Sequence, residues 1–322
     1  MLNPSKKLLS LISFIVLLSV ITGLIFHYAK DIYATLTQVK WPIICLLIFL
    51  HIPMIALGGL AFKILCTPFK IYLRWQDWVG LSFIANLLNQ LFPYRPGMGF
   101  RYLYLRQRYK MSNAEFVYVM LVYFLFTLAI SAAFTLIGGL TGAIPKSFNH
   151  IMLIALALVA LIACFILWLN IHRPSEKSSL HRLVQKTLHA MHILVNNPAI
   201  LIGSSISLIL ANILAALIFY VTFIAIGTPL PFSNCLFLVG IIVIAMIFPI
   251  TPGNIGVLEA LVGTLTQMMY QDFSLGFSVV ALYRASQWVP SIVLGSSFSL
   301  VLVGTLIPRQ KEFKLGTSKG LD

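Results

Sequence analysis

Long apolar runs alternate with short polar or proline-rich segments along almost the whole chain. Six of these runs are long enough to cross the hydrocarbon core of a bilayer, which takes roughly 20 helical residues. They therefore predict six full transmembrane helices. The runs occupy residues 8–27, 41–62, 116–140, 151–169, 199–226 and 277–306.

Two further apolar segments are shorter, and both end in the same kind of break. Residues 79–92 are too few to span a bilayer comfortably, and residues 232–248 are marginal by the same length rule. The first segment leads into FPYRPG at 92–97 and the second into FPITPG at 248–253. The repeated proline, proline, glycine spacing predicts two interrupted helices of related design.

The composition agrees with this pattern. Hydrophobic residues make up 60% of the 322 residues and charged residues only 9%, whereas about a quarter of a soluble domain is charged. We predict an all-α polytopic membrane protein in which residues 1–322 form a single integral membrane domain. The first run follows Lys6 and Lys7 but exceeds the apolar region of a signal peptide, so we expect a retained anchor.

The formal net charge of +14 is divided among short segments between the apolar runs. This distribution sets topology and does not indicate a nucleic-acid partner. By the positive-inside rule, all five basic groups should face the cytoplasm, together with both termini. The groups lie at residues 6–7, 63–74, 95–110, 173–186 and 309–319.

This orientation makes the two interrupted segments re-entrant. Basic groups flank residues 79–92 on both sides, so the segment must return to the face from which it entered. Because the basic tail, residues 307–322, should also be inside, the segment 232–271 must start and finish outside. We therefore expect two re-entrant helical hairpins, at about 79–110 and 232–271, arranged as an inverted repeat whose tips meet near the midplane.

Polar residues accompany the breaks. Asn86, Asn89 and Gln90 share one face of a helix at spacing i, i+3, i+4. Helices should begin after RPGMG and after TPGN, so each tip should present amide donors and partial positive charge, which attract anions. Non-helical backbone at membrane depth must be shielded by protein or line a wet cavity. The pattern predicts a polar cavity between the tips.

Two charged residues stand isolated in apolar surroundings. Glu259 lies within GVLEALVGTL and Arg284 within VVALYRASQWVP. A charge inside a membrane normally faces the bundle interior and has a partner, so we expect these two side chains to pair. A purely structural ion pair is one interpretation, and a role beside a bound phosphate, which arginine binds bidentately, is the other.

These features define a candidate substrate-binding site at the tips of the hairpins. Guanidinium groups would hold the anion, and the amide and glycine positions of the breaks would complete the site. The candidate residues are Asn89, Arg95, Gly97, Arg101, Gly253, Asn254, Glu259 and Arg284.

No other motif indicates a metal, a cofactor or an enzyme. The four cysteines show no CxxC spacing, and the chain contains neither HExxH nor GxSxG. His181, His189 and His192 lie with Gln185 on one face of the segment 178–194. We interpret this segment as a cytoplasmic amphipathic helix on the anionic lipids of the inner leaflet, with metal binding as the alternative.

The motifs resemble the flippase-like membrane domain of bacterial lysylphosphatidylglycerol synthases and related stand-alone membrane proteins. The resemblance rests on three short signatures and covers nearly the whole chain. Met98 departs from the family pattern, because the family has an acidic residue immediately after the glycine that corresponds to Gly97. The matching residues are Asn89, Pro93, Arg95, Gly97 and Arg101, then Pro249, Pro252, Gly253, Gly256 and Glu259, then Arg284, Trp288, Pro290 and Gly295.

The resemblance implies translocation, or flipping, of a phospholipid or lipid-linked anionic headgroup across the bacterial cytoplasmic membrane. Two other functions stay open from the residues alone. One is secondary transport of a small anionic solute through the same cavity, and the other is a non-transporting scaffold or accessory role. The sequence also leaves assembly into a homo-oligomer open.

Overall fold

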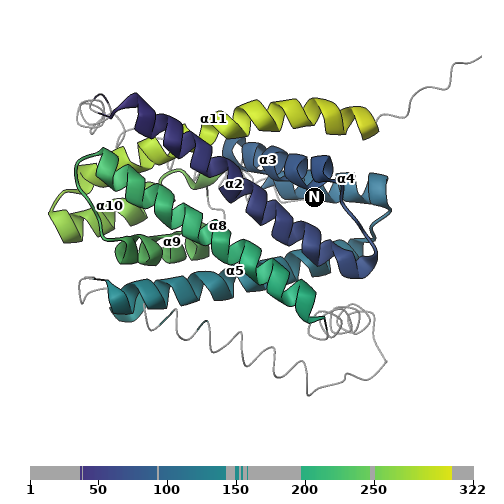
Figure 1. The fold of residues 1–322 in the computed structure, drawn as a ribbon, viewed down its shortest axis with the longest axis horizontal. Coiled ribbons are helices and arrows are strands. Elements are labelled where there is room, and N and C mark those ends of the chain that lie inside the picture. Colours follow the sequence, from purple (N-terminus) through teal and green to yellow (C-terminus); the bar gives the residue numbers. More distant parts are fainter. Residues whose placement is uncertain are drawn as a thin grey trace, which may run out of the picture.

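The computed structural model describes residues 37, 39–92, 94–142, 149–151, 154, 158, 197–246 and 251–306. Within these residues the regular structure is entirely helical (Figure 1). The helices are α2 (Trp41–Cys66), η1 (Thr67–Phe69), α3 (Trp75–Leu91), α4 (Pro96–Tyr109), α5 (Asn113–Thr141), α8 (Pro198–Ala225), α9 (Phe232–Met246), η3 (Pro252–Asn254), α10 (Val257–Tyr270) and α11 (Phe273–Leu306).

Four helices are long and apolar enough to cross a membrane, which supports a multi-pass membrane protein. They are α2, α5, α8 and α11, and they correspond to the predicted spans 41–62, 116–140, 199–226 and 277–306. The predicted spans 8–27 and 151–169 fall outside the described residues, apart from residues 151, 154 and 158. The predicted amphipathic segment 178–194 and the basic tail 307–322 also lie outside them.

Helices α3 and α4 form a helical hairpin that is tied at its base. The Asp77 carboxylate, near the start of α3, accepts hydrogen bonds from the hydroxyls of Tyr104 at 2.6 Å and Tyr109, both in the second half of α4. Burial and this bond raise the pKa of Tyr109 to about 12, so the phenol stays a donor at neutral pH. The two hydroxyls satisfy a carboxylate that is itself buried.

The ends of these two helices differ from the predicted ones for local reasons. Helix α3 begins at Trp75, four residues before the predicted residue 79. There the Asp77 carboxylate accepts the Arg74 N–H at 3.2 Å and caps the first turn. Helix α4 begins at Pro96, within the RPGMG motif, whereas the sequence predicts a start after this motif. Proline suits the first helical position because its φ is preset and it has no N–H to satisfy.

Helices α9 and α10 form a second helical hairpin, separated by a break that contains η3. Its bounds match the predicted segment 232–271 closely. The Asn234 amide, in the first turn of α9, donates to the Met269 sulfur in the last turn of α10, at 3.8 Å. This contact places the start of α9 beside the end of α10, so the chain doubles back between them.

Helix α5 runs from the base of one hairpin to the base of the other. Near its start, Asn113 accepts a hydrogen bond from the Tyr102 hydroxyl of α4 at 2.6 Å. Near its end, Gly138 packs on the backbone of α9, where an added Cβ would lie 2.3 Å from the Phe237 nitrogen. A predicted membrane span therefore separates the two hairpin bases.

Helix α11 connects the same two ends. In its first turn, Gly276 packs so closely on α10 that an added Cβ would lie 2.4 Å from the Gly263 Cα. Toward its other end, Phe298 meets Trp75 of α3 with ring centroids 6.3 Å apart. Figure 1 shows α3 and α4 toward one end of the molecule and α9 and α10 toward the other.

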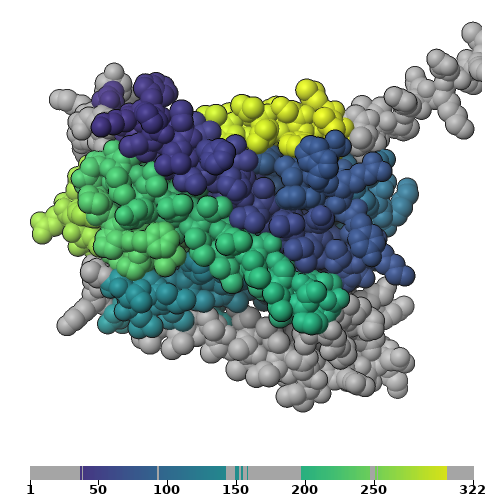
Figure 2. All heavy atoms as spheres, viewed as in Figure 1, coloured from purple at the N-terminus to yellow at the C-terminus, as the bar shows by residue number. Residues whose placement is uncertain are grey.

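The breaks of the two hairpins meet between these ends. Gly253, in the second break, lies against the end of α3, where an added Cβ would be 3.1 Å from the Gln90 carbonyl oxygen. Around this meeting point, helices α2 and α8 pack side by side across the face shown in Figure 2. One buried apolar cluster surrounds each hairpin, one including Leu81 and Leu105, the other including Phe237 and Leu258.

Candidate functional site

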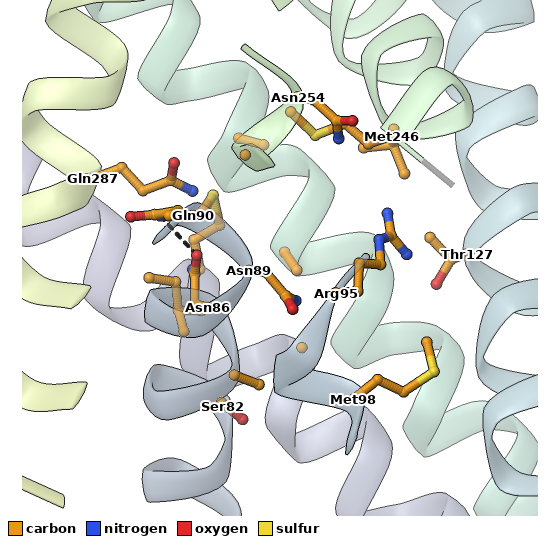
Figure 3. A pocket seen from close by; sticks show the side chains of 18 of the residues that line it. Ser82, Asn86, Asn89, Gln90, Arg95, Met98, Thr127, Met246, Asn254 and Gln287 are labelled. Carbon is orange, nitrogen blue, oxygen red and sulfur yellow. Dashed lines mark hydrogen bonds between the residues drawn. The ribbon is translucent and has the colours of Figure 1, made fainter. Parts of the chain in front are cut away.

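A cavity of about 390 Å³ lies where the two breaks meet. Side chains from both hairpins and from all four candidate membrane spans line it, and Figure 3 shows part of this lining. The structure thus brings most of the predicted site residues together from distant parts of the chain. Those lining the cavity are Asn89, Arg95, Arg101, Gly253, Asn254 and Arg284.

The polar stripe of α3 faces this cavity, since Asn86, Asn89 and Gln90 all line it. The Gln90 amide donates to the Asn86 side-chain oxygen at 2.8 Å, a bond drawn in Figure 3. The Asn89 side-chain oxygen accepts the Gly97 N–H at 3.0 Å. The stripe therefore fixes the break to the helix that precedes it.

Gly97 lies beside the cavity and has a packing role. It is buried against α3, where an added Cβ would lie 2.3 Å from the Ala85 carbonyl oxygen. Backbone this close leaves no space for any side chain, so the glycine lets α4 approach α3. The predicted site residue at position 97 thus positions its neighbours in the break.

Arg95 projects from the first break into the cavity. It is the residue that precedes α4, and its backbone is left-handed, with φ 52° and ψ 57°. Tyr94 before it also has a positive φ of 63°, and two such residues in succession without glycine store strain. The guanidinium lies 5.8 Å from the centroid of the Phe124 ring of α5, and Figure 3 shows the side chain reaching toward Thr127.

Arg101 enters the same cavity from the second turn of α4. Its guanidinium lies 5.0 Å from the centroid of the Phe62 ring, and its Nε is buried without a hydrogen-bond partner. Among the described residues, neither Arg95 nor Arg101 forms an ion pair with a carboxylate. Aromatic faces attract the two cations but leave their positive charge uncompensated.

Arg284 is bound quite differently, in the predicted pair with Glu259. Its Nε donates to Glu259 Oε1 at 2.8 Å and its Nη2 to Oε2 at 3.3 Å. Its Nη1 donates to the Gly253 carbonyl at 2.9 Å, and Nη2 also donates to the Asn254 carbonyl at 3.1 Å. The ion pair predicted from the sequence is confirmed, and the same guanidinium holds the second break in place.

The helix ends at the breaks are less available to an anion than the sequence suggested. The Gly97 N–H in the first turn of α4 bonds to Asn89, and the Gly256 N–H at the start of α10 donates to Glu259 at 2.7 Å. Side chains of the hairpins thus occupy amides that the prediction had left free. The strongest unoccupied positive groups at the cavity are Arg95 and Arg101.

Sequence reasoning overlooked Asn212, which lies in the middle of α8 and lines the cavity. The signal was present, because a buried asparagine is unusual in an apolar membrane span. Of the described cysteines, Cys66 and Cys235 are buried, whereas Cys45 is exposed. No group of potential metal ligands is found in the part of the chain that the structure describes.

The region of the chain that matches a known family includes both breaks and the ion pair. The family model described as lysylphosphatidylglycerol synthase TM region matches residues 10–295. Neither the curated proteins nor the solved structures give a match. Since the matched region comprises most of the chain, this protein belongs to the family of the lysylphosphatidylglycerol synthase transmembrane region.

Proposed function

We propose that this protein translocates a phospholipid or lipid-linked anionic headgroup across the bacterial cytoplasmic membrane. The observation that carries the proposal is the pair Arg95 and Arg101, two arginines without a carboxylate partner among the described residues, in a cavity between two interrupted helices. A guanidinium binds phosphate oxygens with a planar pair of N–H groups and keeps its charge. Membership of a lipid-synthase membrane family agrees with a lipid substrate.

Energetics favours an anion at this position. A charged side chain near the centre of a bilayer costs roughly 2.5 to 3.5 kcal/mol on insertion scales. Glu259 compensates the Arg284 charge, but no carboxylate in the described part of the chain compensates the charges of Arg95 and Arg101. A bound phosphate would compensate both, and a cavity of about 390 Å³ is within the usual size of a ligand site.

In this proposal the two hairpins enter the membrane from opposite faces and form an inverted repeat. Supporting it, α5 and α11 each run from one hairpin base to the other, and each is long enough to span a membrane. The first base also carries most of the described basic residues outside the cavity, whereas Lys40 adjoins the other end. Those at the first base are Lys63, Lys70, Arg74, Arg106, Arg108 and Lys110.

By the positive-inside rule, this asymmetry supports a cytoplasmic position for the base of α3 and α4. Arg106 and Arg108 are exposed there and would contact anionic lipid headgroups. The cavity would then lie between the faces, reached by the tips of both hairpins. A headgroup bound there would be partway between the leaflets while its acyl chains stayed in lipid.

The proposal can be tested by reconstituting the protein in liposomes that contain phospholipids labelled on an acyl chain. Reduction of the outer-leaflet label by dithionite measures the rate of exchange between leaflets. We expect Arg95→Ala and Arg101→Ala each to slow exchange by about tenfold or more, as loss of a charge-assisted hydrogen bond implies. Arg106→Ala is the matched control: Arg106 is an exposed arginine of the same helix and does not line the cavity, so its loss should leave the exchange rate at the wild-type value.

Two outcomes would direct attention to other functions. Uptake of a small anionic solute into vesicles without lipid exchange would assign the same cavity to solute transport. Equal exchange by wild type and both arginine variants, with the variants merely less stable, would indicate a scaffold role and contradict the proposal.

A further inference from the structure

Two residues that line the cavity have a buried amide oxygen without a hydrogen-bond partner among the described residues. They are Asn212 of α8 and Asn254 of the second break, which are 6% and 7% exposed. In the part of the chain that the structure describes, the Oδ1 atom of each side chain is buried and unpaired. Buried acceptors normally have partners, so two such atoms in one cavity require an explanation.

The orientation of the Asn212 amide is determined by its other end. Its Nδ2 donates to the Leu208 carbonyl oxygen at 2.9 Å. If the amide were rotated by half a turn, its oxygen would face that carbonyl oxygen, which cannot donate. The free atom of Asn212 is therefore the acceptor.

Asn254 is held by the loop in which it lies. Its backbone is left-handed, with φ 52°, and its carbonyl oxygen is bound by Arg284. The side chain therefore starts from a fixed point on the wall of the cavity. Figure 3 shows Asn254 on the second break, across from Asn89 and Arg95 of the first hairpin.

The residues that line the cavity thus carry two complementary kinds of polar group. Arg95 and Arg101 offer donors, which suit phosphate oxygens, whereas Asn212 and Asn254 offer acceptors, which a phosphate diester cannot satisfy because it has no proton to donate. A ligand that satisfies all four side chains must carry donors of its own close to its phosphate.

We infer that Asn212 and Asn254 are specificity-determining residues, and that they select headgroups bearing hydroxyl or primary ammonium donors next to the phosphate. This inference rests on the proposed function, since it assumes that a phosphate-containing headgroup enters the cavity. It predicts discrimination against quaternary ammonium headgroups, which have the phosphate but no donor.

Phosphatidylethanolamine and phosphatidylcholine with identical acyl chains provide a matched pair of probes. They share net charge and phosphate and differ in their ability to donate hydrogen bonds. Competition between them for the purified full-length protein can be measured by native mass spectrometry. We expect wild type to prefer phosphatidylethanolamine by roughly tenfold or more, because a hydrogen bond from a charged ammonium donor contributes about this factor.

The preference should fall severalfold in Asn212→Leu and in Asn254→Gly, and it should vanish in the double variant. Glycine accommodates the left-handed backbone at position 254, so that variant should keep its fold. Ser207→Ala is the control, because Ser207 lies on α8, bonds to the Gly203 carbonyl at 2.8 Å and does not line the cavity.

An unchanged preference in both asparagine variants would overturn the inference and assign the two oxygens to bound water. The binding measurement does not depend on translocation, so the two proposals can fail separately. Exchange that depends on Arg95, together with headgroup selection that ignores Asn212 and Asn254, contradicts only this inference. Asparagine-dependent selection by a protein that exchanges no lipid contradicts only the proposed function.

Discussion

At the scale of single residues, the three arginines at the cavity have different roles because their neighbours differ. Arg284 uses its donors on Glu259 and on two carbonyls of the second break. Arg95 and Arg101 lie over aromatic rings instead. A side chain whose donors are already engaged positions a loop, whereas one without a partner is available to a ligand.

The pair of Arg284 and Glu259 yields a prediction about stability. Glu259→Gln removes the negative charge and leaves a guanidinium in a site only 14% exposed. Removing one partner of a buried pair costs about 3 kcal/mol, so thermal unfolding in detergent should occur at a clearly lower temperature. Replacing both residues, in Glu259→Gln with Arg284→Met, should recover part of the loss.

Glu115→Gln is a suitable control for that experiment, because Glu115 is a carboxylate that caps the exposed start of α5. Its loss should change the unfolding temperature only slightly, by the small amount typical of an exposed cap. The interpretation fails if the double variant at 259 and 284 is no more stable than Glu259→Gln alone.

At the scale of elements, the two breaks share a sequence pattern but not a backbone conformation. In the described part of the first break, Tyr94 and Arg95 form a pair of residues with positive φ, and in that of the second break Gly253 and Asn254 form such a pair, followed by Gly256. The left-handed pairs therefore occupy different positions of the proline, proline, glycine motif. The glycines at the matching position of the two motifs also differ. Gly97 is helical and packs against α3, whereas Gly253 has a positive φ of 57°.

The contact of α4 with α3 can be tested with two glycines of the same helix. Gly97→Ala places a Cβ 2.3 Å from backbone that cannot move aside, whereas an added Cβ at Gly99 meets nothing within 4 Å. We expect Gly97→Ala to lower stability by about 2 kcal/mol or more, as overpacking does, and to weaken lipid binding at Arg95. Gly99→Ala should be neutral or slightly stabilising, because alanine favours helix.

Thermal unfolding of the purified variants, with native mass spectrometry of lipid binding, checks this difference. Equal behaviour of the two alanine variants would mean that the close approach of α3 and α4 is not required for the site.

At the scale of the whole molecule, the second helices of the two hairpins end in equivalent ways. Lys110 after α4 and Gln271 after α10 are both exposed, with left-handed φ values of 58° and 57°. In a chain freed of its native cysteines, Lys110→Cys should react with a membrane-impermeant maleimide only from the cytoplasmic side. Gln271→Cys should react only from outside, because α5, a helix long and apolar enough to span a membrane, connects the two bases.

Since both positions have the same backbone conformation, any strain from cysteine is matched between them. Labelling of both from one side would contradict the opposed hairpins and the orientation drawn from the basic residues.

The sequence by itself determined what depends on neighbours along the chain. Apolar length predicted the four described spans, and proline with glycine marked the two interruptions. The partnership of Glu259 and Arg284 was also predictable, because isolated charges in apolar segments need each other. Four of the six predicted residues that line the cavity, Asn89, Arg95, Arg101 and Asn254, followed from the polar residues at the breaks.

Only the tertiary structure decided how those residues are used. Asn212 joined the site because α8 packs with its middle against the cavity, and Arg284 turned toward the second break because α11 passes beside it. Which backbone positions became left-handed was set by the packing of each break against its neighbours. Hydrophobic periodicity reports the environment of one segment, whereas a cavity is a property of distant segments brought together, so its contents emerge only from their packing.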